Sequence, residues 1–326
     1  MEISLWVTNK CNLQCKYCYV DQNKGEQTFD IANVKAFVGF VMDCLSAKDE
    51  PTINFFGGEP LLGFQVIQEV IRCMEEVQVQ GVNYRFTTNG LLLDKQIIDF
   101  IKEKRISVSL SWDGSEKVNN FNRLDFGGNG TFDRIFEKYR LLRDREVDNL
   151  RIRATFNSET YKYLKESVAF FEELDPNMTV VFAADYFDKN WDENRLNELK
   201  SLITDLDSEH HPNITIIGDK LLANSRCGGG VTSCHVYTDG RIYPCSYVVN
   251  NESFCIGNIW KGLDTDKISD LSESYVKRIN ECKGCDYEQY CLSYKCKYLN
   301  YVLAGSLTKA SPIVCMLENI KMCNNI

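Results

Sequence analysis

Three cysteines near the N-terminus have a spacing that could bind an iron–sulfur cluster. Cys11, Cys15 and Cys18 follow a short apolar run, Ile3 to Val7, in the order C-x3-C-x2-C. Three thiolates on one tight loop can bind three irons of a [4Fe–4S] cube, whereas a complete site takes four cysteines. The fourth iron would then keep an open coordination position for a substrate or cofactor. The alternatives are three unrelated buried thiols or a zinc knuckle, but such zinc sites are usually closed by a second cysteine pair, and none lies nearby.

A second concentration of cysteines lies in the last third of the chain. Of the fifteen cysteines, eight fall between Cys227 and Cys296. The chain shows no export signal, and cytosolic thiols are kept reduced, so the pattern indicates metal binding or catalysis rather than disulfides. Eight suitably spaced thiols suit two complete [4Fe–4S] cubes, and two zinc sites are the alternative that the spacing leaves open.

Length, charge and hydropathy limit the class of protein. The 326 residues suffice for one large domain and a smaller one. The 37 basic and 46 acidic residues give a net charge of −9, which argues against a nucleic-acid partner. There is no run of eighteen apolar residues and no secretory signal at the N-terminus, so we expect a cytoplasmic protein without a membrane span.

Short β-branched runs alternate with helical patterns over the first 210 residues. Six β–α units in series predict an α/β fold with parallel strands and right-handed crossovers. The alternation alone leaves a doubly wound sheet and a partial barrel both open. The expected strands are 3–7, 52–56, 84–88, 106–111, 150–156 and 179–184, and the expected helices are 34–45, 64–77, 94–104, 131–143, 161–174 and 191–206.

Polar residues and glycines follow several of the expected strands, at the end where barrel enzymes place their chemistry. Gly57-Gly58-Glu59 ends the second strand, and two glycines allow a close approach of backbone to a ligand. Asn89 and Ser111 stand at the ends of the third and fourth strands. Each of these features also fits an ordinary turn. The fifth strand carries Arg151 and Arg153, whose guanidinium groups suit a carboxylate, with a surface ion pair as the alternative.

Together these features resemble the radical S-adenosylmethionine (SAM) enzymes. Their signature loop has the cysteine spacing found here, with Tyr17 at its aromatic position, and Gly-Gly-Glu-Pro resembles their motif for the methionyl amino group. The resemblance implies a partial (β/α)6 TIM-type barrel over residues 1–215, with SAM bound at the unique iron of the cluster on Cys11, Cys15 and Cys18. The SAM contacts that it implies are Tyr17, Gly57, Gly58, Glu59, Asn89, Ser111, Arg123 and Arg153.

The cysteine-rich region, residues 216–326, resembles the SPASM extension of these enzymes. Its pattern is C-x9-15-G-x4-C, then C-x2-C-x5-C-x3-C and a last cysteine, and this chain departs from it by one extra residue before Cys296. The resemblance implies two auxiliary [4Fe–4S] clusters, hence three in all. The first would use Cys227, Cys234, Cys245 and Cys296, and the second Cys282, Cys285, Cys291 and Cys315. Of the other cysteines, Cys44 and Cys73 fit small buried residues, and neither Cys255 nor Cys323 has an assigned role.

The resemblance implies an enzyme that cleaves SAM to a 5′-deoxyadenosyl radical, which then removes a hydrogen atom from a peptide or protein. This enzyme would need a reductase such as flavodoxin or ferredoxin. Anaerobic sulfatase maturases carry a catalytic aspartate where this chain has Ser246. We therefore rank maturation of a ribosomally made peptide, by a thioether or C–C cross-link or by epimerisation, above formylglycine formation. A base elsewhere, such as Asp185 or Glu59, would weaken that ranking. The alternative from another class is a non-catalytic iron–sulfur electron carrier.

Overall fold

The computed structural model describes residues 1–20, 25–45, 50–209, 211–217, 227–273, 282–288 and 290–322, so Cys323 lies outside the described residues. Its strands form one curved sheet in the order β11-β10-β9-β8-β1-β2-β3-β4-β5-β6-β7. The strands are β1 (Glu2–Thr8), β2 (Thr52–Gly57), β3 (Asn83–Thr88), β4 (Ser107–Ser111), β5 (Leu150–Phe156), β6 (Thr179–Ala184), β7 (Ile214–Ile216), β8 (Ser233–Val236), β9 (Arg241–Tyr243), β10 (Gly257–Asn258) and β11 (Gly262–Leu263).

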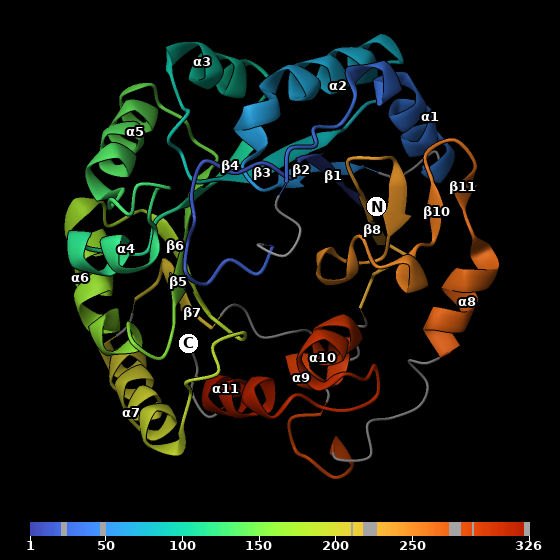
Figure 1. Cartoon of the computed structure of the whole chain (residues 1–326). Coiled ribbons are helices and arrows are strands. Elements are labelled where there is room, and N and C mark those ends of the chain that lie inside the picture. Colours follow the sequence, from blue (N-terminus) through green and yellow to red (C-terminus); the bar gives the residue numbers. More distant parts are fainter. Residues whose placement is uncertain are drawn as a thin grey trace.

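The strands from β8 through β1 to β7 all pair in parallel, and helices follow them on the outside. Figure 1 shows α1, α2, α3, α5, α6 and α7 surrounding the convex face of the sheet, which is the partial barrel that the resemblance implies. The helices are α1 (Val34–Cys44), α2 (Phe64–Glu76), α3 (Lys95–Glu103), α4 (Glu116–Asn122), α5 (Phe132–Asp144), α6 (Leu164–Leu174), α7 (Glu193–Glu209), α8 (Thr265–Glu273), α9 (Leu292–Lys295), α10 (Lys297–Ala304) and α11 (Pro312–Met322).

Two apolar clusters pack against the two faces of the sheet, one on each face. Successive side chains of a strand point to opposite faces, so the residues of β1 divide between them. Ile3, Leu5 and Val7 belong to the large core between the sheet and its outer helices. Trp6 belongs to a smaller cluster on the inner face, together with Tyr243 of β9 and other aromatic residues of the C-terminal region.

The predicted α/β fold is confirmed, and all six predicted strands and helices occur within a few residues of their expected bounds. Helix α3 illustrates why: Asp94 caps its N-terminus by accepting the Ile97 N–H at 2.8 Å. Strands β7 and β8 were not predicted, because they are only three and four residues long. The sheet continues through β8 past residue 215, and the domain boundary there stays a prediction.

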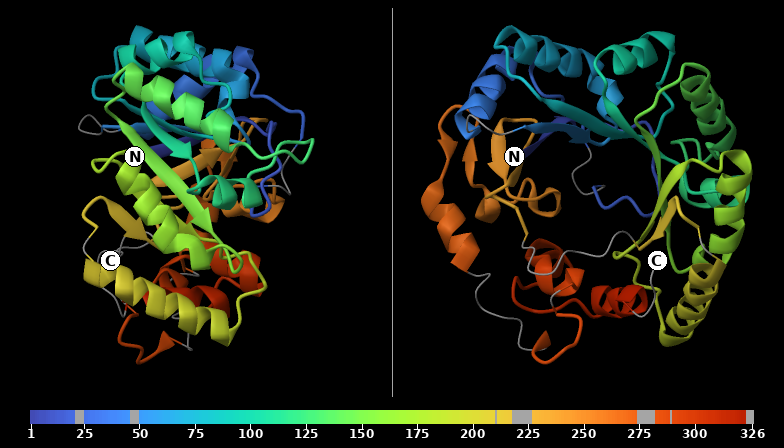
Figure 2. Two further views of the ribbon diagram at one scale, coloured as in Figure 1. Left: turned by 90° about the vertical axis from the view of Figure 1, so that its left-hand side faces the viewer. Right: turned by 180° about the vertical axis from the view of Figure 1, so that it is seen from behind.

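The C-terminal region occupies the open side of the curved sheet. The Asp239-Gly240 turn joins β8 and β9 in an antiparallel hairpin, and Gly240 has a φ of 83°. Helices α9 to α11 lie across the opening in Figures 1 and 2, and α11 contacts α7. Within the described residues, no helix has the length and apolar character that crossing a membrane requires.

Candidate functional site

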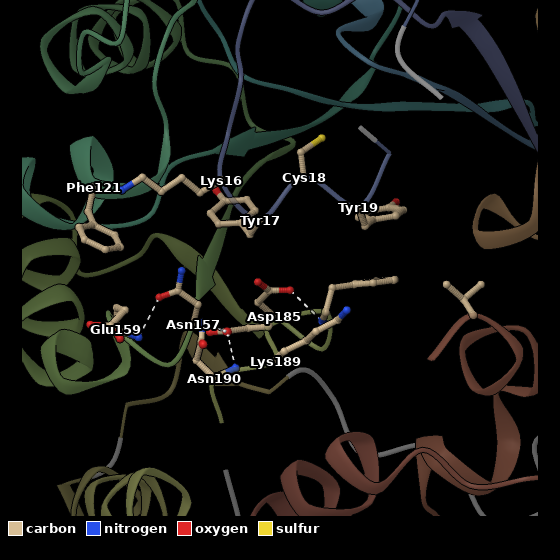
Figure 3. Close-up of a pocket in the computed structure, with 13 residues that line it drawn as sticks. Lys16, Tyr17, Cys18, Tyr19, Phe121, Asn157, Glu159, Asp185, Lys189 and Asn190 are labelled. Atoms are coloured by element: carbon tan, nitrogen blue, oxygen red, sulfur yellow. Dashed lines mark hydrogen bonds between the residues drawn. The ribbon is translucent and has the colours of Figure 1, made fainter. Parts of the chain in front are cut away.

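The loop that carries the N-terminal cysteines runs along the inside of the curved sheet (Figure 3). It begins directly after β1, and backbone hydrogen bonds attach it to the end of α4. The Gln14 N–H donates to the Leu124 carbonyl at 2.9 Å, and the Lys16 N–H donates to the Asn122 carbonyl at 3.0 Å. These bonds fix the path of the loop across the strand ends.

Cys11, Cys15 and Cys18 lie near one another on this loop. Burial raises the pKa of Cys11 to about 12, and the charges of Glu59, Cys15 and Cys18 also raise it. Thiolates that repel one another in this way are stabilised by cations, because a metal ion deprotonates a coordinating thiol outright.

Three thiols on one loop suit the chemistry of an iron–sulfur cube. Within the described residues, no three His, Cys, Asp or Glu side chains lie close enough together to hold one metal ion. The thiolates of a [4Fe–4S] cube bind at separate corners, so they need not converge on one point. Three soft thiolates on one loop therefore fit three irons of a cube.

The two glycines after β2 allow the backbone of this turn to approach the cysteine loop. The Gly58 N–H donates to the Thr8 carbonyl at 3.0 Å, and the Glu59 N–H donates to the Lys10 carbonyl at 2.8 Å. A Cβ on Gly57 would lie 2.0 Å from the Thr8 oxygen, and one on Gly58 would lie 2.2 Å from the Lys10 oxygen. The glycines thus position the cysteine loop, and these two N–H groups are already used within the chain.

Gly58→Ala is expected to disturb the cluster loop, because its Cβ would also lie 3.1 Å from the Cys11 Cβ. We expect the visible absorption spectrum of the anaerobically reconstituted variant to change and its iron content to fall. Gly39→Ala on α1 is the matched control, since nothing lies within 4 Å of a Cβ at that position. An unchanged spectrum in Gly58→Ala would show that the loop tolerates the displacement.

Glu59 and Asn89 connect the ends of β2 and β3 to the cysteine loop. The buried Glu59 carboxylate accepts hydrogen bonds from the Leu61 N–H at 3.1 Å, the Thr88 hydroxyl at 2.7 Å and the Asn89 N–H at 2.7 Å. Burial raises its pKa to about 7. The Asn89 side chain donates to Asn12 Oδ1 at 2.7 Å. Both side chains therefore have partners in the chain next to the loop, and their role as SAM contacts stays a prediction.

Tyr17 and Arg123 both contact Asp113, which follows β4. The Tyr17 hydroxyl donates to Asp113 Oδ2 at 2.7 Å, and Arg123 Nε lies 3.1 Å from Asp113 Oδ1. The Arg123 guanidinium lies 5.4 Å from the centre of the Tyr17 ring. Our sequence analysis assigned Tyr17 and Arg123 to SAM but no role to Asp113. The signal for it was a carboxylate at a strand end, next to Ser111.

Arg153 projects to the inner face from β5, where it pairs with Ser111 of β4. Ser111 is buried, whereas the Arg153 side chain is exposed. The charge of Arg153 lowers the pKa values of Tyr19 and Tyr186, which places it near both rings, although burial raises those pKa values by more. An exposed guanidinium inside the curved sheet is available to an anionic ligand.

A cavity of about 660 Å³ lies between the cysteine loop and the ends of β5 and β6 (Figure 3). This volume falls in the usual range for small-molecule or side-chain binding sites. Polar and aromatic side chains line most of it. The lining residues are Lys16, Tyr17, Cys18, Tyr19, Phe121, Asn157, Glu159, Asp185, Phe187, Asp188, Lys189, Asn190 and Val302.

Asp185 is the most buried carboxylate of this cavity, with 9% of its surface exposed. It follows β6 and faces the cysteine loop across the cavity in Figure 3. Burial raises its pKa to about 6, and the charge of Asp188 also raises it, although the Phe187 N–H donates to Oδ1 at 2.9 Å. A carboxyl group with a pKa near 6 in a cavity can accept a proton at neutral pH.

An aromatic cluster of Tyr19, Phe187 and Tyr247 connects the cysteine loop to the C-terminal region. The Tyr19 ring centre lies 5.3 Å from that of Tyr247 and 6.1 Å from that of Phe187. Tyr19 also contacts the Ser246 side chain, and the charges of Cys245 and Cys18 both raise the pKa of its hydroxyl. This cluster therefore lies between the N-terminal cysteines and Cys245.

Three of the four cysteines expected for the first auxiliary cluster come together. Burial raises the pKa of Cys245, and the charges of Cys296 and Cys227 raise it further. Cys227 and Cys245 pack against the inner aromatic cluster that contains Trp6. Cys234 does not join them: it is buried in the outer core, where Cys44 affects its pKa.

Two of the cysteines expected for the second auxiliary cluster, Cys291 and Cys315, lie near Glu318 of α11. The charge of Cys315 raises the pKa of Cys291, and that of Cys285 raises the pKa of Cys315. The Cys285 N–H donates to the Cys282 carbonyl at 3.1 Å, so the C-x2-C pair forms one turn.

Glu318 and Lys321 form a buried ion pair beside these thiols, with 3.0 Å between Nζ and Oε1. Glu318 Oε2 accepts the Leu292 N–H at 2.8 Å, and Tyr186 after β6 donates to Oε1 at 3.3 Å. Glu318 thus joins the second cysteine group to the barrel. Our sequence analysis missed it, although two charges three residues apart in a mostly apolar segment were a signal.

A partial α/β barrel with three thiolates at its strand ends is the arrangement of an enzyme that binds a cofactor at an iron–sulfur cluster. The family model described as the radical SAM superfamily matches residues 6–171, just over half of the chain. The chain belongs to the radical SAM superfamily and is an enzyme of that class. The family implies SAM and a [4Fe–4S] cluster as cofactors.

The chain is also similar to individual relatives and solved structures. The cysteine-type anaerobic sulfatase-maturating enzyme of Clostridium perfringens (strain 13 / Type A) is 28% identical, over 86% of this chain and 84% of that protein. The structure described as native anSMEcpe with bound AdoMet has a TM-score of 0.81 at 20% identity, over 98% and 95% of the two chains. Streptococcus suis SuiB bound to its precursor peptide SuiA has a TM-score of 0.69 at 19% identity, over 96% and 75%.

Proposed function

We propose that this radical SAM enzyme is a maturase that modifies a peptide or protein side chain in the cavity beside Cys18. The single observation that carries the proposal is the 660 Å³ cavity, which the cysteine loop and Asp185 line together. Substrate entering there would lie next to the cofactor loop. The relatives support a peptide substrate, since one matures sulfatases and SuiB is described with a precursor peptide.

When bound at the cysteine loop, SAM would supply the radical chemistry, and the residues of the chain would supply position and protection from water. Tyr17, Asp113 and Arg123 hold the cysteine loop against β4. Arg153 is the proposed partner of the SAM carboxylate, because it is the exposed guanidinium near Tyr19.

The proposal includes two auxiliary [4Fe–4S] clusters in the C-terminal region and a reductase such as flavodoxin or ferredoxin. The support for the clusters is the gathering of Cys227, Cys245 and Cys296 in one place and of Cys285, Cys291 and Cys315 in another. Such clusters would accept the electron left when the substrate radical is oxidised. With the first cluster, the chain would bind about twelve irons.

Maturation of a ribosomally made peptide, by a thioether or C–C cross-link or by epimerisation, is the first candidate reaction. Ser246 supports this ranking, because a serine hydroxyl next to Cys245 cannot act as the base that a sulfatase maturase needs. It contacts Tyr19, whose pKa burial raises to about 12, so no stronger base activates it from that side.

Formylglycine formation is the second candidate, and two observations favour it. The sulfatase-maturating relative matches 86% of the chain, and Asp185 places a carboxylate in the cavity by another route. Asp185 therefore does not distinguish the two candidate reactions, since either reaction can require a proton acceptor.

The test is incubation of the reconstituted, reduced protein with SAM, followed by measurement of 5′-deoxyadenosine. Its absence would favour a non-catalytic electron carrier and overturn the proposal. Mass spectrometry of a sulfatase-type peptide then separates the candidates. Oxidation of its serine or cysteine to the aldehyde would place formylglycine formation first, whereas an unmodified peptide supports the cross-link or epimer.

Asp185→Asn is expected to lower peptide product formation by about 10²–10⁴-fold, the usual contribution of a general base. With a pKa of about 6, Asp185 is ionised above that pH, so product formation by the unaltered enzyme should rise with pH through 6. The variant should lose this dependence. The measurement is product per 5′-deoxyadenosine formed at pH 5 to 8.

Glu159→Gln is the matched control for Asp185→Asn. Glu159 lines the same cavity but is exposed and forms a surface ion pair with Arg195 at 3.1 Å. Its neutralisation should leave the ratio of product to 5′-deoxyadenosine and its pH dependence unchanged. Equal ratios in Asp185→Asn and the unaltered enzyme would remove Asp185 from the proton transfer.

A further inference from the structure

Cys234 lies on the face of the sheet opposite to the cysteines with which its sequence position groups it. Strand β8 is an interior strand, paired in parallel with β1 and antiparallel with β9. In this register Cys234 pairs with Ile3, and both side chains belong to the outer core between sheet and helices. Only 1% of the Cys234 surface is exposed.

The neighbours of Cys234 confirm its side of the sheet. Apart from burial, the charge that raises its pKa is that of Cys44, which ends α1 on the outside of the barrel. The next residue, His235, points the other way and packs on Phe56, with 5.7 Å between ring centres. Phe56 packs against the inner aromatic cluster.

Cys227 and Cys245 lie on the inner face. Both pack against the cluster that contains Trp6, whose side chain points away from those of its strand neighbours Leu5 and Val7. Cys296 lies with them, because it directly precedes α10, which contacts the turn after Cys245 and contributes Tyr298 to the same cluster. The sheet therefore separates Cys234 from these three thiols.

A shift of register would not bring Cys234 to them without wider damage. Sliding β8 by one residue would turn Val236 out of the outer core and force His235 into it, since every side chain of the strand changes face. The strand is paired on both sides, so both ladders would break.

We propose that Cys227, Cys245 and Cys296 alone hold the first auxiliary cluster, that Cys234 is a core residue, and that the cluster's fourth iron binds a thiolate from outside the chain. The inference rests on the auxiliary clusters of the proposed function. A complete [4Fe–4S] site takes four thiolates, so three leave one iron open to a further ligand of the same soft class.

The open position would border the substrate cavity. Tyr19 lines the cavity, and its ring centre lies 5.3 Å from that of Tyr247, two residues after Cys245. Val302 also lines it, from helix α10, which begins directly after Cys296. A cysteine side chain of a bound peptide is thus the thiolate best placed to reach the iron.

The first experiment measures iron in anaerobically reconstituted variants. Cys234→Val, which keeps an apolar side chain of similar size in the strand, should retain about twelve irons per chain, as should Cys234→Ala. Cys245→Ala should retain about eight, because only two thiolates remain to hold that cluster. A loss of about four irons in the folded Cys234 variants would overturn the inference.

The second experiment detects the open iron directly. The protein for this experiment has Cys11, Cys15 and Cys18 all replaced by alanine. It therefore lacks the N-terminal cluster, which would also have an open iron. Adding 2-mercaptoethanol to this reduced protein should change its electron paramagnetic resonance spectrum. A sulfatase-type peptide with a cysteine should do the same at lower concentration than the free thiol, and its alanine counterpart should not.

The failures are distinguishable. About four irons in the unaltered protein would refute the auxiliary clusters and this inference together. About twelve irons with no spectral response to either thiol would refute the open position alone.

Cys255 supplies a further check, because it packs against the same inner cluster and its Sγ lies 3.4 Å from the Gly257 carbonyl. Loss of about four irons in Cys255→Ala would make it the fourth ligand and overturn the proposal.

Discussion

Replacing Cys11, Cys15 and Cys18 together by alanine is expected to abolish SAM cleavage and to lower the iron content from about twelve to about eight per chain. The three thiols occupy one loop, which the end of α4 and the turn after β2 hold in place. No other described cysteine lies within that loop, so no substitute ligand is available there. The measurements are 5′-deoxyadenosine formation and anaerobic iron analysis.

The control for this variant is the proposed pair of auxiliary clusters, whose expected cysteines lie in a separate part of the chain. Their visible absorption should remain, since the thiols near Cys245 and those near Glu318 belong to the C-terminal region. Loss of all iron in the triple variant would contradict the independence of these sites. Retention of SAM cleavage would place the cofactor elsewhere.

The fold could be predicted from the sequence where long periodic segments carried the signal. Helix α2 buries Ile67, Val70, Ile71 and Met74 along one face, which is a pattern that only a helix produces. The place of β8 could not be predicted, because four residues show no clear period and pairing with β1 depends on the closure of the whole sheet. For the same reason the sequence could not show which face Cys234 occupies.

The candidate site, like the fold, could be predicted from the sequence only in part. Spacing drew attention to the N-terminal cysteines, because Cys11, Cys15 and Cys18 lie close together in the chain. Spacing could not reveal that Asp113 engages Tyr17 and Arg123, since the three residues come from the cysteine loop, the end of β4 and the end of α4. The cavity beside Asp185 likewise forms only when β6 and the cysteine loop face each other (Figure 3).

Arg123→Met is expected to lower the free energy of unfolding by about 3–5 kcal/mol, the usual result of leaving one charge of a buried pair without its partner. Arg123 and Asp113 are both buried, with 3.1 Å between Nε and Oδ1. Asp113 would still accept hydrogen bonds from Tyr17 and from the Thr155 N–H, but its charge would be uncompensated. Thermal unfolding followed by circular dichroism should show Tm lower by on the order of 10 °C.

Two further variants show whether the buried charge causes this loss. Arg134→Met removes an exposed guanidinium 3.5 Å from Asp125 and should cost less than about 1 kcal/mol. Asp113→Asn in the Arg123→Met background removes the uncompensated charge, and it should restore part of the lost Tm because an amide oxygen can still accept a hydrogen bond. If Arg123→Met unfolds at the same temperature as Arg134→Met, the pair contributes little to stability. Arg123 would then be free to serve a ligand, as the resemblance to radical SAM enzymes first implied.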